Sequence, residues 1–204
     1  AVTVTGNRIT SIEPADEARP PTEAETIDLS GFTCLPGLID AHTHLVDRSE
    51  GEAYNWARPL MTSGAEMALW SLPNARKTLL AGFTTVRDMG TYRAFVDVAL
   101  RDAIDRGTVP GPRMQPAGAY VTISGGAGAL TGFAADVELP LELRFGQADG
   151  PDQVRQRVRE IGLEPAQQHL GAREPGDAAA EHGVLAHRQI LAVHQEKAEV
   201  AREI

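Results

Sequence analysis

The sequence predicts an α/β protein whose parallel strands are flanked by helices. From residue 37 to residue 161, short β-rich runs alternate with segments whose apolar residues recur at helical spacing. Glycines stand where these helical segments should end. Such an alternation is typical of βα units, in which each helix returns the chain to start a parallel strand. On this pattern alone, a closed barrel and an open doubly wound sheet fit equally well.

The composition is that of an ordinary globular protein. Of 204 residues, 42% are hydrophobic and 23% are charged, which suits one domain or one domain with a small second one. The single cysteine, Cys34, cannot form an internal disulfide, so nothing requires an oxidising compartment and we expect a cytoplasmic protein. No apolar run approaches the roughly 20 residues of a membrane helix. The net charge of −9, from 28 acidic and 19 basic residues, disfavours nucleic acid and anionic membranes as partners.

The first 35 residues predict a small β unit. Residues 2–12 hold two alternating β-rich runs around Gly6 and Asn7, a pattern that favours a hairpin with a two-residue turn. Residues 13–25 are acidic and contain proline, and we expect them to form a loop. A further strand is expected at Thr26–Leu29, with extended chain continuing up to Pro36.

The first βα unit begins with Gly37–Leu45, an apolar run that we expect to be a buried strand. The following helical stripe ends near Gly82, where a helix C-cap belongs. Pro73 either kinks this helix or marks its first turn after Ser71. The stripe consists of Ala68, Leu72, Ala75 and Leu79.

The second unit pairs a strand at Thr84–Met89 with a helix that ends at Gly107, and its stripe is Val96, Leu100 and Ala103. At the end of this strand, Arg87 and Asp88 could face a substrate or pair with each other.

The third unit begins with a strand expected at Arg113–Val121. The glycine-rich run Gly125–Gly128 lacks the Lys-Ser/Thr ending of a phosphate-binding P-loop, so an active-site loop is the better interpretation. Asp149 is expected to cap the next helix, whose apolar face is Val154, Val158 and Ile161.

His42 and His44 are the candidate functional residues. Side chains two apart on a strand project from the same face, and the strand's C-terminal end is where α/β proteins place their active sites. Two convergent imidazoles suit a divalent metal such as zinc, iron, nickel or cobalt. The alternative is a pair of hydrogen-bonded histidines with no metal.

The segment around these histidines resembles the first barrel strand of the amidohydrolase superfamily. The resemblance is carried by Leu35–Leu45, in which Pro-Gly-Leu-Ile-Asp-Ala precedes His-Thr-His. Three further stretches match members of the superfamily, namely Ile27–Gly31, Ala81–Asp88 and Gly111–Met114. The pattern is most similar to the subgroup with imidazolonepropionase-like and Xaa-Pro dipeptidase-like enzymes. It covers about residues 1–161, so the chain resembles the N-terminal part of such an enzyme.

This resemblance implies an incomplete (β/α)₈ barrel of the TIM type. Its first three βα units occupy residues 36–161, beside a small N-terminal β-sandwich portion in residues 1–35. It also implies that His42 and His44 bind a divalent metal, with zinc the first candidate and one or two ions in the intact family protein. The implied function is metal-dependent hydrolysis of a carbon–nitrogen bond in a small amide or peptide substrate. A homo-oligomer is compatible with this interpretation.

The later part of the chain departs from the family pattern. No lysine occurs between Lys77 and Lys197, although a lysine or glutamate on the fourth strand is a family ligand. The aspartate that acts as general base on the family's last strand has no counterpart, so no catalytic or substrate-binding residue is assigned. We therefore expect a truncated chain that is inactive in isolation. The alternative is a catalytically dead fragment that acts only as a binding or assembly piece.

Residues 162–204 are expected to be a divergent, mainly helical tail. The run Val184–Ile204 contains neither glycine nor proline and predicts a helix. The tail holds four of the six histidines, including His169. For the three in its final stretch, which are His182, His187 and His194, irregular spacing favours solvated positions over a metal cluster.

Overall fold

The computed structural model of the chain describes residues 1–6, 8–46 and 57–169. These residues belong to two compact units, one with residues 1–37 and the other with the described residues from Leu38 onward. Each unit is described by itself. None of the described helices is both long enough and apolar enough to cross a membrane.

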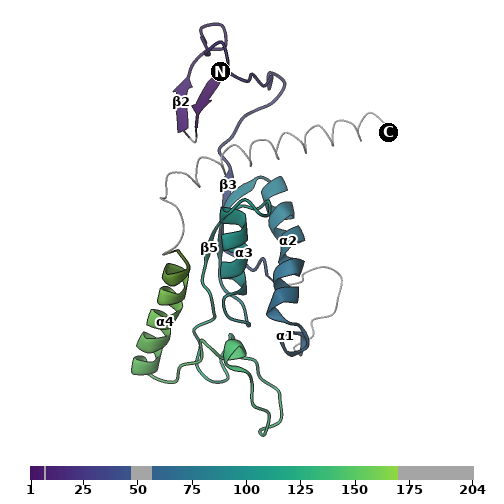
Figure 1. The fold of residues 1–204 in the computed structure, drawn as a ribbon, viewed down its shortest axis with the longest axis vertical. Helices are drawn as coiled ribbons and strands as arrows, with labels where there is room; N and C mark the ends of the chain where they lie inside the picture. Colours follow the sequence, from purple (N-terminus) through teal and green to yellow (C-terminus); the bar gives the residue numbers. More distant parts are fainter. Residues whose placement is uncertain (7, 47–56, 170–204) are drawn as a thin grey trace, which may run out of the picture. The chain divides into compact units, whose positions relative to one another are not determined.

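The first unit contains the hairpin that the sequence predicts. Strand β1 (Val2–Thr5) pairs antiparallel with β2 (Arg8–Ile12), as Figure 1 shows. Gly6 has a φ of +61°, which suits a glycine in a tight turn. The base of the hairpin is closed by a hydrogen bond from the N–H of Glu13 to the carbonyl of Ala1, at 3.1 Å.

The strand predicted at Thr26–Leu29 is wrong, because this segment pairs with no described strand, and the chain turns just after it at Ser30 and Gly31. The carboxylate of Asp28 accepts the N–H of Ser30 at 2.9 Å, and the carbonyl of Leu29 accepts the N–H of Phe32 at 2.9 Å. An aspartate that bonds to the backbone two residues on stabilises a turn in place of an extended strand.

The second unit is built on a parallel sheet of β3 (Leu38–Thr43), β4 (Phe83–Asp88) and β5 (Arg113–Pro116), in that spatial order. The prediction of a mixed α/β fold with a parallel sheet is therefore confirmed. Strand β5 is shorter than the predicted range to residue 121, because Gly118 adopts a φ of +82° and turns the chain away from the sheet.

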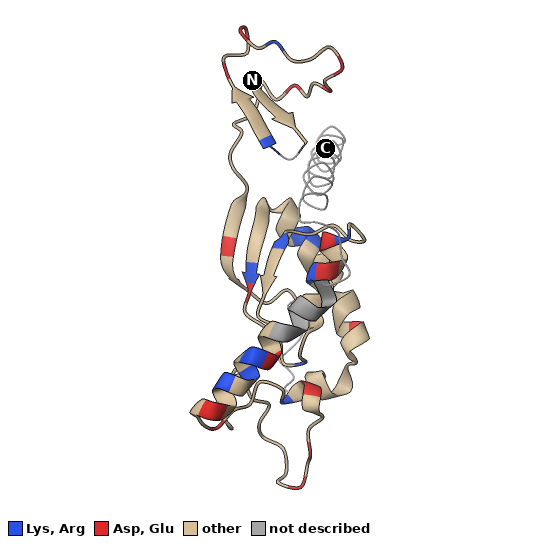
Figure 2. Cartoon of the chain, turned by 60° about the vertical axis from the view of Figure 1, so that its left-hand side comes forward, with Lys and Arg blue, Asp and Glu red and all other residues tan. Residues whose placement is uncertain are grey.

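Helices α1 (Arg58–Met61), α2 (Gly64–Leu80) and α3 (Val96–Asp105) follow the strands. The side chain of Ser63 caps α2, and Pro73 lies inside this helix and not in its first turn. Helices α2 and α3 contact each other and the strands, so they form a layer on one face of the sheet (Figures 1 and 2). The core between the layers contains Leu45, Ala75, Val86, Leu100, Ile104 and Met114.

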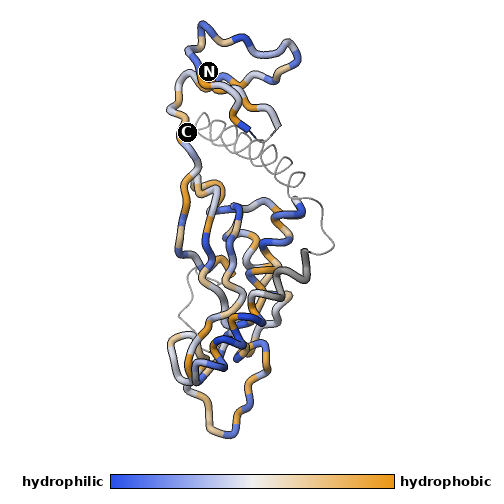
Figure 3. The backbone as a smooth tube through the Cα atoms, turned by 90° about the vertical axis from the view of Figure 1, so that its left-hand side faces the viewer, coloured by the Kyte–Doolittle hydropathy of each residue, from blue (hydrophilic) through white to orange (hydrophobic). Residues whose placement is uncertain are grey.

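The other face of the sheet is open among the residues that the structure describes. Ile39 on β3 is 72% exposed, and Leu38 is 50% exposed. These exposed positions are hydrophobic, and hydrophobic positions of the strand are visible in orange in Figure 3. The prediction that Gly37–Leu45 is a buried strand is therefore wrong for β3, while Leu45 just beyond it is buried. A parallel strand is buried on both faces only where both faces of its sheet are covered.

An irregular segment with a single 3₁₀ turn, η1 (Leu141–Leu143), connects β5 to α4 (Pro151–His169). The expected cap at Asp149 is not the arrangement found, because its carboxylate accepts hydrogen bonds from the N–H and hydroxyl of Ser124, at 2.7 and 2.5 Å. Helix α4 continues past residue 161. The helix expected at Val184–Ile204 and the histidines at positions 182, 187 and 194 lie outside the described residues.

Candidate metal centre

His42 and His44 lie together at the C-terminal edge of β3. Their ring centroids are 5.3 Å apart, with the planes inclined at 74°, and both side chains are exposed. Thr43 turns to the other side, where its hydroxyl lies 3.4 Å from the carboxylate of Asp88. The predicted projection of both imidazoles from one side of the strand is confirmed, and both rings lie at an exposed surface of the described part of the chain.

His44 is oriented by two residues that lie far from it in the sequence. Its Nδ1 is 3.2 Å from the carbonyl oxygen of Gly90 and 3.1 Å from the hydroxyl oxygen of Tyr120. A carbonyl oxygen can only accept, so the Gly90 contact requires the proton on Nδ1. A neutral His44 then keeps the lone pair on Nε2, which is the form that a metal ligand needs.

Asp88 bonds to the residues on both sides of His44. Its buried carboxylate accepts the N–H of Leu45 at 2.7 Å, the N–H of Gly90 at 3.2 Å and the hydroxyl of Thr43. Burial raises the pKa of this carboxyl, while these hydrogen bonds and the neighbouring His44 act in the opposite direction. Arg87 instead donates from Nε to the carbonyl of Ala41 at 2.8 Å, so Arg87 and Asp88 do not form the pair considered from the sequence.

Asp97 joins α3 to the segment after β5. Its carboxylate accepts the N–H of Val98 at 2.9 Å and the N–H of Gly118 at 2.8 Å. Burial raises the pKa of Asp97 to about 6, the nearby carboxylate of Asp88 adds to this rise, and the hydrogen bonds oppose it. The carboxyl therefore connects the neighbouring βα units on the side of the sheet edge that carries His44.

The centroid spacing of the two imidazoles is compatible with a shared divalent ion. With a Zn–N distance of about 2.1 Å and tetrahedral angles, two imidazoles on one ion have centroids about 5 Å apart. The observed 5.3 Å agrees with this spacing. Among the described residues, however, no group of three or more His, Cys, Asp or Glu side chains gathers around a common point. The described residues thus offer two ligands, fewer than the three or four of an ordinary zinc site.

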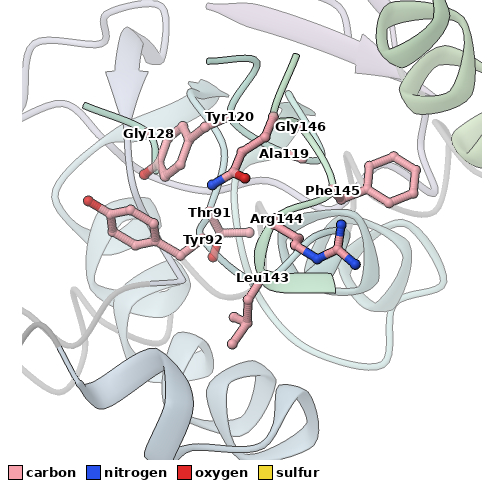
Figure 4. Close-up of a pocket in the computed structure, with 10 residues that line it drawn as sticks. Thr91, Tyr92, Ala119, Tyr120, Gly128, Leu143, Arg144, Phe145 and Gly146 are labelled. Atoms are coloured by element: carbon pink, nitrogen blue, oxygen red, sulfur yellow. The ribbon is translucent and has the colours of Figure 1, made fainter. Parts of the chain in front are cut away.

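Next to His44 lies a small open pocket that includes Thr91, Tyr92, Tyr120, Gly128 and Gly146. Figure 4 shows Tyr92 and Tyr120 side by side on one side of this pocket, with Phe145 on the other.

Sequence reasoning missed Tyr120 and Gly90 as partners of His44. The topology could have indicated them. Gly90 and Tyr120 each follow a parallel strand, and the carboxyl ends of parallel strands lie at one edge of the sheet, which is also where His42 lies.

The fold is that of an α/β protein whose candidate functional side chains lie at the carboxyl edge of a parallel sheet. Residues 33–173 match the amidohydrolase family. This segment is more than half of the 204 residues, and the chain belongs to that family.

Two curated relatives are similar to the chain. The allantoinase of Streptomyces avermitilis is 34% identical over 105 residues, which cover 48% of this chain and 23% of the relative. The imidazolonepropionase of Arthrobacter sp. strain FB24 is 28% identical over 142 residues, which cover 58% of this chain and 35% of the relative.

Solved structures are also similar to the chain. A Xaa-Pro dipeptidase with methionine bound in its active site matches with a TM-score of 0.68 and 31% identity, over 80% of this chain and 39% of that one. A prolidase complexed with N-methylphosphonate-L-proline matches with a TM-score of 0.64 and 31% identity, over 80% and 39%. The resemblance to the imidazolonepropionase-like and Xaa-Pro dipeptidase-like subgroup is confirmed. The chain spans 23% to 39% of the length of these four proteins.

Proposed function

We propose that this chain carries part of the centre of a metal-dependent hydrolase of carbon–nitrogen bonds. His42 and His44 serve as two of the metal ligands. The observation that carries the proposal is the pair of adjacent imidazoles at the carboxyl edge of a parallel sheet, within a segment that belongs to the amidohydrolase family.

Zinc is the first candidate among the divalent metals, because two imidazoles at this spacing suit it. When bound, such an ion supplies Lewis acidity, which polarises a carbonyl and lets water act as a nucleophile near neutral pH. The contribution of this chain is to orient its ligands. The Gly90 carbonyl sets the tautomer of His44, and Asp88 fixes the backbone that carries it.

The proposed substrate is a small amide or peptide. The names of the relatives include an allantoinase, an imidazolonepropionase and a Xaa-Pro dipeptidase, and the last of these names denotes an enzyme that acts on dipeptides. A choice among these substrates would depend on groups beyond the two histidines.

For the fold, we propose that residues 36–161 are the first three βα units of an incomplete (β/α)₈ barrel and that residues 1–35 contribute to a small β-sandwich. The parallel order β3-β4-β5 and the uncovered face around Ile39 support the barrel proposal, because a barrel interior would cover that face. Three further expectations stay predictions. They are that residues 162–204 form a separate helical tail, that the protein is cytoplasmic and that it forms a homo-oligomer.

We further propose that the isolated 204-residue chain is catalytically inactive and holds metal weakly, since the two ligands found among the described residues leave an ion open to water on most sides. Zinc titration followed by the ¹⁵N signals of the histidine rings tests the ligands. We expect the signals of His42 and His44 to respond together, and His42→Ala or His44→Ala to abolish the response.

Asp136→Asn, which removes a carboxylate from an exposed position, is the control, and it should leave the response at His42 and His44 unchanged. A zinc response that survives both His42→Ala and His44→Ala would reject these two residues as the ligands. The isolated chain could instead turn over amide substrates and lose this activity in His42→Ala. That result would support His42 as a ligand and would reject the proposed inactivity.

A further inference from the structure

We propose that Tyr120 is a positioning residue for the metal ligand His44. Together with the carbonyl of Gly90, its hydroxyl holds the imidazole with the proton on Nδ1, so that Nε2 is the nitrogen left for a metal. This inference rests on the proposed metal site, and it concerns a residue 76 positions away in the sequence.

The geometry of the contact carries the proposal. The hydroxyl oxygen of Tyr120 lies 3.1 Å from Nδ1 of His44, and the ring centroids are 5.9 Å apart in an edge arrangement. Because the Gly90 carbonyl at 3.2 Å can only accept, the single N–H of Nδ1 lies between two oxygens. The phenol oxygen therefore acts as a second acceptor, and its ring limits rotation of the imidazole.

The chain is shaped to bring Tyr120 to this position. Gly146 packs directly on the backbone of Tyr120, where a Cβ would overlap the tyrosine carbonyl oxygen. A Cβ at Gly128 would lie 2.6 Å from the Cβ of Tyr120. Hydrogen bonds between Thr122 and the backbone of Gly146 and Ala148, at 3.1 and 2.8 Å, hold the two segments together. The glycine-rich run that the sequence assigns to an active-site loop thus makes room for this tyrosine.

Tyr92 extends the same row of rings without reaching His44. Its centroid is 5.1 Å from that of Tyr120, and its hydroxyl lies 3.5 Å from the carbonyl of Ala127. The close approach of the two tyrosines is visible in Figure 4. Tyr92→Phe therefore removes an adjacent phenol hydroxyl that does not contact the ligand, which makes it a matched control for Tyr120→Phe.

The test uses the 204-residue chain and two readouts. The first is the tautomer of His44 in metal-free protein, from ¹⁵N–¹H ring correlations at a pH where imidazole is neutral. We expect Tyr120→Phe to shift the population away from the Nδ1–H form, and Tyr92→Phe to leave it unchanged. The second readout is the zinc titration of the His44 signal. Here Tyr120→Phe should weaken binding by roughly tenfold, because partners of ligating histidines contribute about 10- to 100-fold to metal affinity.

Gly128→Ala provides a second variant, since it keeps the phenol but displaces it. It should change the tautomer in the same direction as Tyr120→Phe. An unchanged tautomer population in folded Tyr120→Phe would overturn the proposal, as would a changed tautomer with wild-type zinc affinity. If the proposed metal site is wrong, the zinc response will be insensitive to His42→Ala and His44→Ala. The tautomer of His44 in metal-free protein would still test the role of Tyr120.

Discussion

The carboxylate of Asp88 lies 2.7 Å from the backbone nitrogen of Leu45, and this bond ties the end of β4 to the residue that follows His44. The same oxygen lies 3.4 Å from the hydroxyl of Thr43, so one carboxylate oxygen contacts the residues on both sides of the histidine. The other oxygen accepts the N–H of Gly90, whose carbonyl in turn faces His44. Asp88 therefore positions both the imidazole and its acceptor.

Asp88→Asn should lower the free energy of unfolding by about 1–3 kcal/mol. In asparagine, an NH₂ group replaces one of the two carboxylate oxygens. This NH₂ would face an N–H or hydroxyl donor that has lost its acceptor, and a buried donor without an acceptor costs about 1–3 kcal/mol. Urea unfolding measures the change. Asp136→Asn removes a carboxylate from an exposed position and should change the free energy by less than about 0.5 kcal/mol. Equal effects of the two substitutions would show that the Asp88 contacts do not stabilise the edge.

Local pattern is sufficient to predict the elements whose packing is local. The stripe at Val96 and Leu100 predicts α3, and Gly107, with a φ of +70°, follows the helix end as expected. The two-residue period of a strand places His42 and His44 on one side.

Contacts between distant residues are not encoded in any local period. Nothing in the sequence next to Tyr120 indicates that it meets His44, and nothing at Asp88 announces its bond to Leu45. The strand expected at Thr26–Leu29 fails for the same reason, since a β-rich run becomes a strand only when a partner pairs with it. The open face around Ile39 likewise depends on which segments cover the sheet.

Asp97 should make stability depend on pH between about 4 and 6. Its pKa is raised by burial from 3.8 to about 6, so the folded protein binds this proton more tightly than the unfolded chain does. The resulting stabilisation is full below about pH 4 and is lost as the pH rises through 6. Asp97→Asn removes the titration. Its free energy of unfolding relative to wild type should therefore rise by about 2–3 kcal/mol from pH 4 to pH 7.

Urea unfolding at a series of pH values measures this difference, and the titration of carboxyls that do not interact with Asp97 cancels in it. A flat or falling difference for Asp97→Asn would contradict the expected burial of a charged carboxylate at the start of α3.

Leu79 and Leu69 lie on the same helix and provide a matched pair for the core. Leu79 is 2% exposed, whereas Leu69 is 65% exposed. Leu79→Ala should lower the free energy of unfolding by about 2–5 kcal/mol, because it removes buried methyl groups and leaves a cavity under the sheet. Leu69→Ala should be within about 0.5 kcal/mol of wild type. Similar losses for both would mean that the exposed side of α2 is covered in solution.

Arg93 connects three segments that flank the sheet edge. Its guanidinium forms an ion pair with Glu142 at 2.7 Å and donates to the carbonyls of Pro59 and Thr62, at 2.9 and 3.1 Å. Arg93→Ala should therefore lower the free energy of unfolding by about 1.5–3 kcal/mol, the range for hydrogen bonds to charged groups. Arg93→Lys should recover only part of this loss, because an ammonium group lacks the planar fork that reaches several acceptors at once.

The control for the Arg93 prediction is Arg155→Ala. Arg155 forms an ion pair with Asp152 on the exposed side of α4, and such a pair contributes about 0–1 kcal/mol. Hydrogen exchange locates the effect. Amides of α1 and η1 should exchange faster in Arg93→Ala, while those of β4, which carries no partner of this guanidinium, should keep their protection. Uniform loss of protection across β4 and α1 would show that Arg93 stabilises the whole unit, and its description as a local connection between segments would be wrong.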